Sequence, residues 1–330
     1  MDTNALKQTA TALVAAGKGI LAADESAKTI QKRFEKIGLQ SSPEINLAYR
    51  KMLFTTPGIE QFLSGVILYD ETIRQSIDGV SVPKYLESRG ILPGIKVDQG
   101  LVDLPNSVGE KITEGLEGLK ERLSEYKQLG AKFAKWRAVI TIGDGLPTDA
   151  CIEANAEVLA GYAALCQEQD IVPIIEPEVL RDGAYDLQKG KEITVRTLKK
   201  VFEKISAYKV LLQGLILKPN MVTCGEDNPN QATPKEVAQA SIEAYQQSVP
   251  AEVQGIVFLS GGQSPDMATA NLAAINQIGG PWQLSFSFSR ALQGEALEIW
   301  AGKEENVEDA QKVFFDRAQK VSEARSGKFL

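Results

Sequence analysis

Eight short apolar runs, separated by longer stretches of helical periodicity, constrain the fold of this 330-residue chain most strongly. Each run is rich in Ile, Val, Leu or Phe, and they lie at residues 19–23, 65–69, 94–97, 133–140, 171–175, 214–217, 255–259 and 284–288. The runs are continuously apolar rather than alternating, which is typical of parallel strands buried on both faces. We therefore expect an α/β fold in which buried strands and helices alternate.

The segments between the runs carry helix signals. The apolar spacing over residues 112–126, followed by Gly130, predicts one helix, and the spacing over 193–208 predicts another. Thr233-Pro234-Lys235-Glu236 is a capping box with proline at the first helical position, and residues 306–325 form a last amphipathic segment. We expect residues 1–330 to form a single-domain (β/α)8 TIM barrel with extra N-terminal and C-terminal helices. A doubly wound open sheet is the second possibility, but neither a G-x-G-x-x-G after the first run nor a P-loop supports it.

The chain contains no histidine, and this excludes several kinds of active site. Ser-His-Asp and Cys-His nucleophile pairs, His-ligated zinc and imidazole acid/base catalysis are all ruled out. The three cysteines include no C-x-x-C pair and suggest a reducing compartment, so we expect a cytoplasmic protein. The N-terminus does not read as a secretory signal, and no run of about 18 apolar residues predicts a membrane span. The formal charge of −7 argues against broad nucleic-acid binding but allows a local basic cluster for an anionic substrate.

Charged residues cluster at the ends of the apolar runs. Strand residues two apart point to the same face, so each of three pairs sends two charges the same way: Lys96 and Asp98, Lys135 and Arg137, and Glu176 and Glu178. In a barrel, Asp24, Lys96, Lys135, Glu176 and Lys218 would share the mouth where barrel active sites form. A structural ion-pair network is the alternative for any one of them. It explains the whole set poorly, because several lysines crowded together repel one another unless a function requires them.

Two further segments suggest phosphate binding. The seventh run leads into a glycine-rich turn that opens a helix, and the eighth leads into an arginine at the start of another. These segments contribute Ser260, Gly261, Gly262, Ser289 and Arg290. The loops after strands seven and eight form the usual barrel phosphate site, and N–H groups at a helix N-terminus favour an anion. A plain loop is the alternative interpretation of the glycines. Lys32 and Arg33 form a second basic spot, which by itself fits a solvated helix face.

These motifs together resemble those of class I, Schiff-base fructose-1,6-bisphosphate aldolase. The resemblance covers nearly the whole chain in order, through LAADESAKTIQKR, GVILYDETI, GIKVDQG, FAKWRAV, IVPIIEPE, LLQGLILKPNMVT, GIVFLSGGQS and FSFSRALQ. The metal-dependent class II enzymes rely on histidine ligands, which this chain lacks. The resemblance implies no cofactor and no metal, with a sugar bisphosphate and triose phosphates as small-molecule partners. It also implies a homo-oligomer, commonly a tetramer.

The resemblance also implies a role for each matching residue. Lys218 matches the Schiff-base lysine, Glu176 the general acid/base, Asp24 an aspartate near the reacting carbons, and Lys135 a substrate-positioning lysine. Arg137, Lys96 and Glu178 match further polar groups of the site. Ser260, Gly261 and Arg290, with neighbouring Gly262 and Ser289, match one phosphate site, and Ser26, Lys32 and Arg33 lie near the other. Because no histidine is present, we expect Glu176 to cover proton transfers, with its pKa raised by burial.

The chain departs from the family pattern at a few places. Well-studied members carry a longer tail ending in tyrosine, whereas this sequence ends at Leu330, so we expect a truncated tail or another group in its role. Ser289 stands where glycine is usual, Phe288 replaces a common tyrosine, and Asp70 occupies a place often held by histidine, which we interpret as peripheral. Two alternatives remain: sedoheptulose 1,7-bisphosphate as the main or a side substrate, and a non-catalytic sugar-phosphate-binding scaffold. The sequence does not decide whether such an enzyme would work mainly in glycolysis, gluconeogenesis or carbon fixation.

Overall fold

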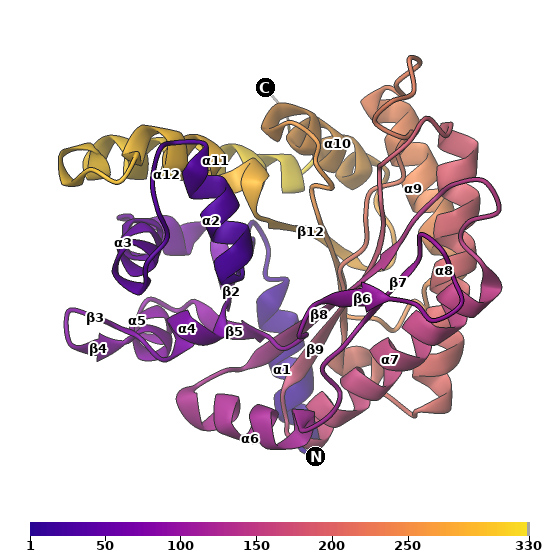
Figure 1. The fold of residues 1–330 in the computed structure, drawn as a ribbon, viewed down its shortest axis with the longest axis horizontal. Coiled ribbons are helices and arrows are strands. Elements are labelled where there is room, and N and C mark those ends of the chain that lie inside the picture. The colour runs from indigo at the N-terminus through magenta and orange to yellow at the C-terminus, as the bar shows by residue number, and fades with distance from the viewer. Residues whose placement is uncertain (329–330) are drawn as a thin grey trace.

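Eight parallel strands close into one barrel in the computed structural model, which describes residues 1–328 (Figure 1). The barrel strands are β1 (Gly19–Ala23), β2 (Leu63–Leu68), β5 (Leu92–Lys96), β8 (Phe133–Ile140), β9 (Val172–Val179), β10 (Ile216–Leu217), β11 (Gly255–Phe258) and β12 (Gln283–Phe288). Their order around the barrel is β1-β12-β11-β10-β9-β8-β5-β2. All eight apolar runs coincide with barrel strands, which confirms the predicted (β/α)8 fold.

Helices surround the strands, as Figure 1 shows. They are α1 (Thr3–Leu13), α2 (Ala27–Glu35), α3 (Pro43–Phe54), α4 (Asp70–Ile73), α5 (Val82–Ser88), α6 (Leu119–Leu129), α7 (Asp149–Glu168), α8 (Leu187–Ala207), α9 (Pro234–Ser248), α10 (Pro265–Ile278), α11 (Arg290–Trp300) and α12 (Val307–Arg325), with single 3-10 turns at Ile59–Gln61, Leu212–Gly214 and Glu304–Asn306. The capping box at α9 is present as predicted, with Thr233 and Glu236 each accepting from the other's backbone N–H. Ser26 caps α2 by accepting from the backbone N–H of Thr29, which fixes the start of that helix shortly after β1.

The extra N-terminal helix closes one end of the barrel. Leu6, Leu13 and Val14 pack into one cluster with Ile20, Phe133 and other residues that fill the barrel interior. Glycines in the strands make room for this packing: a Cβ on Gly255 would lie 2.6 Å from Val14, and one on Gly94 would lie 2.2 Å from the Phe133 ring. The barrel is therefore solid at this end, and open space remains only where the strands run out.

The helix predicted over residues 112–126 is wrong in its first half. Ile112 lies in β7 (Lys111–Thr113), which pairs antiparallel with β6 (Leu101–Asp103), and α6 begins only at Leu119. Gly115 and Gly118 adopt φ values of +123° and +63°, a conformation that ends the strand and delays the helix. A second hairpin pairs β3 (Ser76–Ile77) with β4 (Val80–Ser81) and was not predicted; its turn is formed by Asp78 and Gly79, both with positive φ. Along residues 1–328, none of the helices has the length and apolarity needed to cross a bilayer. Phe329 and Leu330, at which we expected the tail to end, lie outside the described residues.

The packing of Phe133 predicts that Gly94→Ala destabilises the barrel. The added methyl group would overlap the fully buried ring of Phe133, and overpacking of this kind costs about 1–3 kcal/mol of the free energy of unfolding. Gly294→Ala is the matched control, because Gly294 lies in α11 with open space around its Cβ position, and alanine there should stabilise the helix by about 0.5–1 kcal/mol. Urea unfolding of the two variants measures both changes. Equal stability of the Gly94→Ala variant and the unchanged protein would contradict this description of the interior.

Candidate active site

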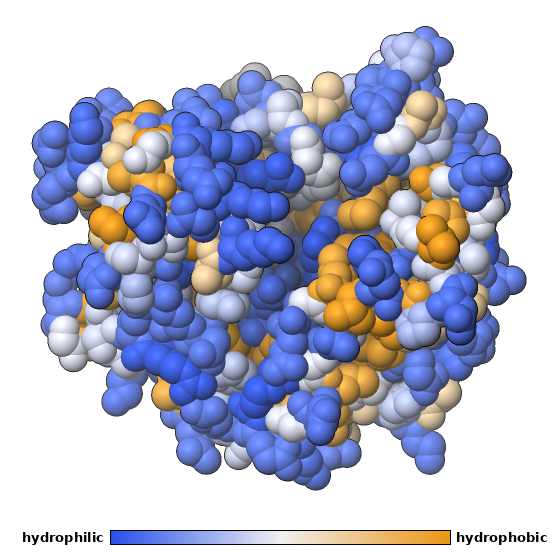
Figure 2. All heavy atoms as spheres, viewed as in Figure 1, coloured by the Kyte–Doolittle hydropathy of each residue, from blue (hydrophilic) through white to orange (hydrophobic). Residues whose placement is uncertain are grey.

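A cavity of about 720 Å³ lies at the carboxyl ends of the barrel strands. Figure 2 shows this face hollowed near its centre, with hydrophilic residues gathered along one side. The residues that line the cavity include almost all of those singled out from the sequence: Asp24, Ser26, Arg33, Lys96, Lys135, Arg137, Glu176, Glu178, Lys218, Ser260, Gly261, Gly262, Ser289 and Arg290. Convergence of the strand ends therefore brings together residues that lie up to 266 positions apart in the chain, from Asp24 to Arg290 (290 − 24 = 266).

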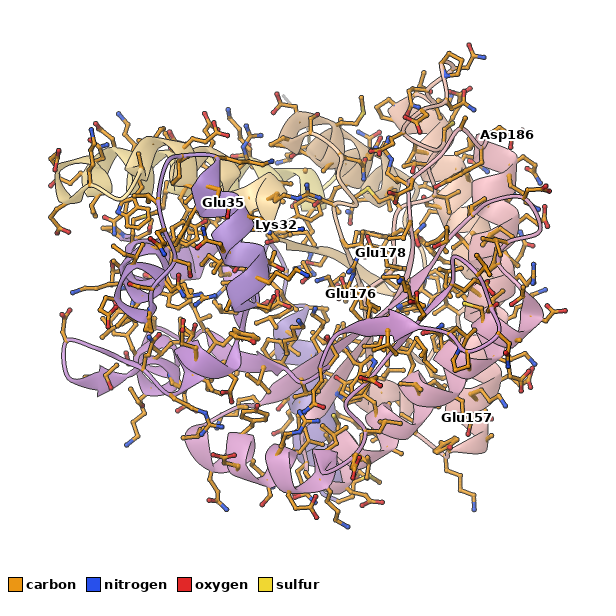
Figure 3. The ribbon with its side chains drawn as sticks, in the orientation of Figure 1. Lys32, Glu35, Glu157, Glu176, Glu178 and Asp186 are labelled. Carbon is orange, nitrogen blue, oxygen red and sulfur yellow. The ribbon has the colours of Figure 1, made fainter. Side chains whose placement is uncertain are left out.

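The strand register aims the charged residues at the cavity. Lys135 lies opposite Lys96 on β5, and Arg137 lies opposite Glu176 on β9, so residues two apart on each strand share the inner face as predicted. Figure 3 shows Glu176 and Glu178 near the middle of the ring of helices. Lys218 follows β10 directly, and its backbone N–H donates to the carbonyl of Ile175 over 2.8 Å, which fixes its place beside β9.

One carboxylate lies between two buried lysines at the centre of the cavity. Glu176 Oε1 is 3.1 Å from Lys218 Nζ, and Glu176 Oε2 is 3.1 Å from Lys135 Nζ. Lys135 Nζ also lies 2.7 Å from Asp24 Oδ2. The side chains of Lys135, Glu176 and Lys218 are at most 5% exposed, so bulk water screens these interactions weakly.

The pKa values of this cluster follow from the two lysines. Burial alone raises the pKa of a carboxyl group, but Lys135 and Lys218 outweigh that effect and hold the pKa of Asp24 well below its usual range. The pKa of Glu176 is likewise lowered, because Lys135, Lys218 and Arg137 together outweigh its burial. Burial lowers the pKa of Lys135, yet the carboxylates of Asp24 and Glu176 raise it above its usual value. The expectation that burial raises the pKa of Glu176 is therefore wrong, because it left out the cations that face the carboxylate.

Two further ion pairs lie around the central cluster. Arg137 Nε donates to Glu178 Oε2 over 2.5 Å, and Lys96 Nζ lies 3.4 Å from Asp98 Oδ1. Burial alone lowers the pKa of Arg137, but Glu178 and Glu176 outweigh that effect and raise it above its usual value. These side chains supply donors and acceptors of fixed direction around the cavity, which suits a ligand with several hydroxyl groups.

The predicted phosphate segments border the same cavity. Gly261 and Gly262 both adopt positive φ, +55° and +77°, and form a turn without side chains after β11. Arg290 is the first residue of α11, and its Nη2 lies 3.7 Å from the position that a Cβ on Gly262 would occupy. Exposed backbone N–H groups, a helix N-terminus and a guanidinium are the groups that bind phosphate in proteins.

The second predicted phosphate region is arranged differently from the expectation. Arg33 does not extend freely into the cavity, because it pairs with buried Glu25 and donates from Nη2 to Ser289 Oγ over 2.9 Å. Lys32 is exposed on α2 and is not among the residues that line the cavity (Figure 3). Lys28 and Thr29, one turn nearer the N-terminus of α2, line the cavity there.

Sequence reasoning missed several residues of the site. Glu25, which also accepts from Gln293, and Lys28 lie within the AADESAK segment, so their neighbours in the sequence were the available signal. Arg181 follows the IEPE segment by three residues and also lines the cavity. Asp70 instead borders a neighbouring hollow, where it pairs with Arg74 over 2.8 Å. Within residues 1–328 no cluster of three or more potential metal-ligating side chains occurs.

The shared ion pairs predict that Lys135→Met lowers the free energy of unfolding in a pH-dependent way. At pH 8 the variant retains the buried carboxylate of Glu176 and the largely buried one of Asp24 without their common cation, which should cost about 3 kcal/mol. The lowered pKa of Asp24 means that its pairing stabilises the fold above the ordinary carboxyl pKa and that this stabilisation is lost as the pH falls. The deficit of the variant should therefore persist from pH 8 to about pH 4 and shrink only as the pH falls below about 4 toward the lowered pKa of folded Asp24.

Urea unfolding at pH 8, 5 and 3 checks this prediction. Lys132→Met is the control, because its ion pair with Glu87 is exposed and such pairs contribute less than about 1 kcal/mol. A deficit in the Lys135→Met variant that stays constant between pH 8 and pH 3 would show that the carboxylates do not cause it.

Comparisons with known proteins point to the same family that the residues of the site resemble. A family model described as class-I fructose-bisphosphate aldolase matches residues 5–330. A probable fructose-bisphosphate aldolase class 1 of Xylella fastidiosa is 50% identical over 332 residues, covering 100% of this chain and 99% of that protein. The cytosolic fructose-bisphosphate aldolase 6 of Arabidopsis thaliana is 50% identical over 95% of this chain and 88% of its own length.

A solved structure shows the same similarity in three dimensions. The fructose-bisphosphate aldolase of Plasmodium falciparum superposes with a TM-score of 0.98 at 46% identity, covering 99% of this chain and 95% of that one. The agreement extends over the whole barrel rather than over one motif. The chain therefore belongs to the class-I fructose-bisphosphate aldolase family, whose members typically work through a Schiff base.

Proposed function

We propose that Lys218 forms the Schiff base with fructose 1,6-bisphosphate and that Glu176 carries the proton transfers. The observation that carries this proposal is the 3.1 Å contact between Lys218 Nζ and Glu176 Oε1 inside the cavity. A nucleophile and a base within hydrogen-bonding distance are the minimum that amine catalysis requires. The intact set of Asp24, Lys135, Glu176 and Lys218 argues against a non-catalytic scaffold, which would be free to lose one of them.

The steps of the reaction follow from this arrangement. Glu176 is ionised at neutral pH because its pKa is lowered, so it starts as a base and takes a proton from Lys218. The neutral amine attacks the C2 ketone, and the resulting carbinolamine loses water when Glu176 returns the proton to the departing hydroxyl group. The product is an iminium ion at C2, which draws electrons from the neighbouring carbon as a metal ion would.

Cleavage then needs a base at the C4 hydroxyl group. We assign this role to Glu176, with Asp24 aligning and stabilising the developing charge through Lys135. Loss of the C4 hydroxyl proton breaks the C3–C4 bond, releases glyceraldehyde 3-phosphate and leaves its electron pair as an enamine on Lys218. Protonation at C3 and hydrolysis then release dihydroxyacetone phosphate and restore the amine. Each step is reversible, so the same groups serve condensation.

The strand order supports one orientation of the substrate. The glycine turn follows β11, which pairs directly with β10, so it lies next to Lys218. The N-terminus of α2 follows β1, three strands away from β10 around the barrel. The C1 phosphate is one carbon from the ketone that Lys218 attacks, whereas the C6 phosphate is four carbons away. We therefore place the C1 phosphate at the glycine turn and Arg290, and the C6 phosphate near Ser26, Lys28 and Thr29.

Trapping with borohydride tests the central assignment. Dihydroxyacetone phosphate added to the protein should form an iminium that borohydride reduces to a stable adduct, and peptide mass spectrometry should locate it on Lys218. The Lys218→Met variant should give no adduct and no measurable cleavage, while Lys132→Met serves as a matched lysine control outside the cavity. EDTA should leave the activity unchanged, as expected for a metal-independent lyase. An adduct on a different lysine would refute the assignment.

Sedoheptulose 1,7-bisphosphate remains the alternative substrate, because it presents the same ketose end with one more carbon. The C1 half of both sugars would meet the same groups around Lys218. The extra carbon changes only the distance to the second phosphate, and we expect the larger kcat/KM with fructose 1,6-bisphosphate. Steady-state kinetics with both sugars measure this ratio, and a higher value for the seven-carbon sugar would reverse the assignment. A homo-oligomer, with a tetramer as the expected form, is proposed from the family resemblance alone.

A further inference from the structure

Most cations that line the cavity already face a carboxylate. Five of them lie within 4 Å of one: Arg33, Lys96, Lys135, Arg137 and Lys218. Within residues 1–328, three lining cations have no such ion pair: Lys28, Arg181 and Arg290. A guanidinium without a carboxylate partner at the edge of a polar cavity retains its donors for an anionic ligand. Arg290 and Lys28 lie at the two phosphate positions already proposed, which leaves Arg181 without a function.

The side chain of Arg181 crosses the end of the strand that carries Lys218. Arg181 follows β9, yet its guanidinium donates to the Cys224 carbonyl over 3.5 Å and to Gln231 Oε1 over 3.3 Å, both after β10. Its Cδ lies 3.8 Å from the position of a Cβ on Gly261, in the turn after β11. Since β10 lies between β9 and β11, the arginine spans three neighbouring strand ends.

The glycine turn therefore has an arginine on each side. Arg181 approaches Gly261, and Arg290 approaches Gly262. Both glycines lack side chains and adopt positive φ, so the turn exposes its backbone between two planar donor groups. A phosphate group resting on the turn would meet a guanidinium from either flank. Asp182 and Glu226 are exposed at the same edge of the cavity, so replacing Arg181 with an uncharged residue would make the local charge there more negative.

We propose that Arg181 is a second phosphate-binding arginine. Together with Arg290 it binds the C1 phosphate of the ketose and the phosphate of dihydroxyacetone phosphate. This assignment rests on the proposed function and on the orientation of the substrate derived from the strand order. The arginine acts on binding rather than on the bond that breaks, because the C1 phosphate keeps its charge through the reaction. Its contribution is therefore the same in the ground state and in the transition state.

Kinetics of Arg181→Gln test the proposal. The KM for fructose 1,6-bisphosphate should rise about threefold to tenfold, with kcat changed by less than about twofold. Fructose 1-phosphate, which keeps only the C1 phosphate, should show the same fold-increase in KM. The inhibition constant of inorganic phosphate should rise as well. Arg196→Gln is the matched control, because Arg196 pairs with Asp149 outside the cavity and should leave all these values unchanged.

Two more variants distinguish phosphate binding by Arg181 from a purely structural role, in which Arg181 only holds the loop after β10 in place. Gln231→Ala removes the contact with the loop after β10 but keeps the charge of Arg181, and it should leave KM unchanged. Arg181→Lys keeps the charge without the planar donor set and should restore part of the affinity. The proposal is overturned if Gln231→Ala reproduces the rise in KM. It is also overturned if Arg181→Gln raises the KM for the bisphosphate but not for fructose 1-phosphate, or if it changes neither.

The failure of this assignment is distinguishable from failure of the proposed function. If the unchanged protein forms no borohydride-trapped adduct on Lys218, the proposed function fails and the role of Arg181 fails with it. If that adduct forms and the Arg181→Gln variant keeps the kinetics of the unchanged protein, only the assignment of Arg181 is wrong.

Discussion

The carboxylate of Glu176, held between Lys135 and Lys218, is the interaction on which the rest of the site depends. Its three members come from β8, β9 and the end of β10, which are neighbours in the barrel. The fourth member, Asp24, follows β1 and reaches Lys135 from three strands away around the ring. That contact crosses the mouth of the barrel, so it exists only because the sheet closes. Closure of the fold and balance of the buried charge are therefore one constraint.

Under the proposed role of Glu176, this balance also explains how a chain without histidine would carry out proton transfers at neutral pH. Imidazole titrates near neutrality by itself, whereas an ordinary carboxyl group does not. Glu176 has a lowered pKa and rests as a carboxylate, so it becomes an acid only after it has taken a proton from a partner at hydrogen-bonding distance. The neighbouring amine and the substrate hydroxyl groups are such partners. The acid form is thus produced within the catalytic cycle rather than present at its start.

The sequence predicted the barrel well because its signals were both local and redundant. Eight continuously apolar runs need only be buried on both faces, and charges two residues apart on a strand must share a face. The prediction of a helix over residues 112–126 failed because the spacing of apolar residues takes no account of the glycines between them. Gly115 and Gly118 adopt positive φ, which a helix does not allow. Glu25, Lys28 and Arg181 were missed although each lies in or near a segment that was singled out, because the segment alone does not show which of its side chains reach the cavity. The direction of the pKa shift at Glu176 failed for the same reason, because it depends on cations that come from other strands.

The solid end of the barrel gives the open end its asymmetry. Helix α1 and the ring of Phe133 fill the interior at one end, and the strand glycines allow this close packing. The cavity therefore lies at the carboxyl ends of the strands, and most of the residues that line it are charged or polar. A sugar with phosphates at both ends has two ways to lie across that mouth, and both would satisfy the phosphates. In the proposed orientation, the position of Lys218 beside the glycine turn would break this symmetry, because a ketone would lie within reach only when its own phosphate occupies the turn. Under this proposal, strand order in the barrel would select which end of the sugar reacts.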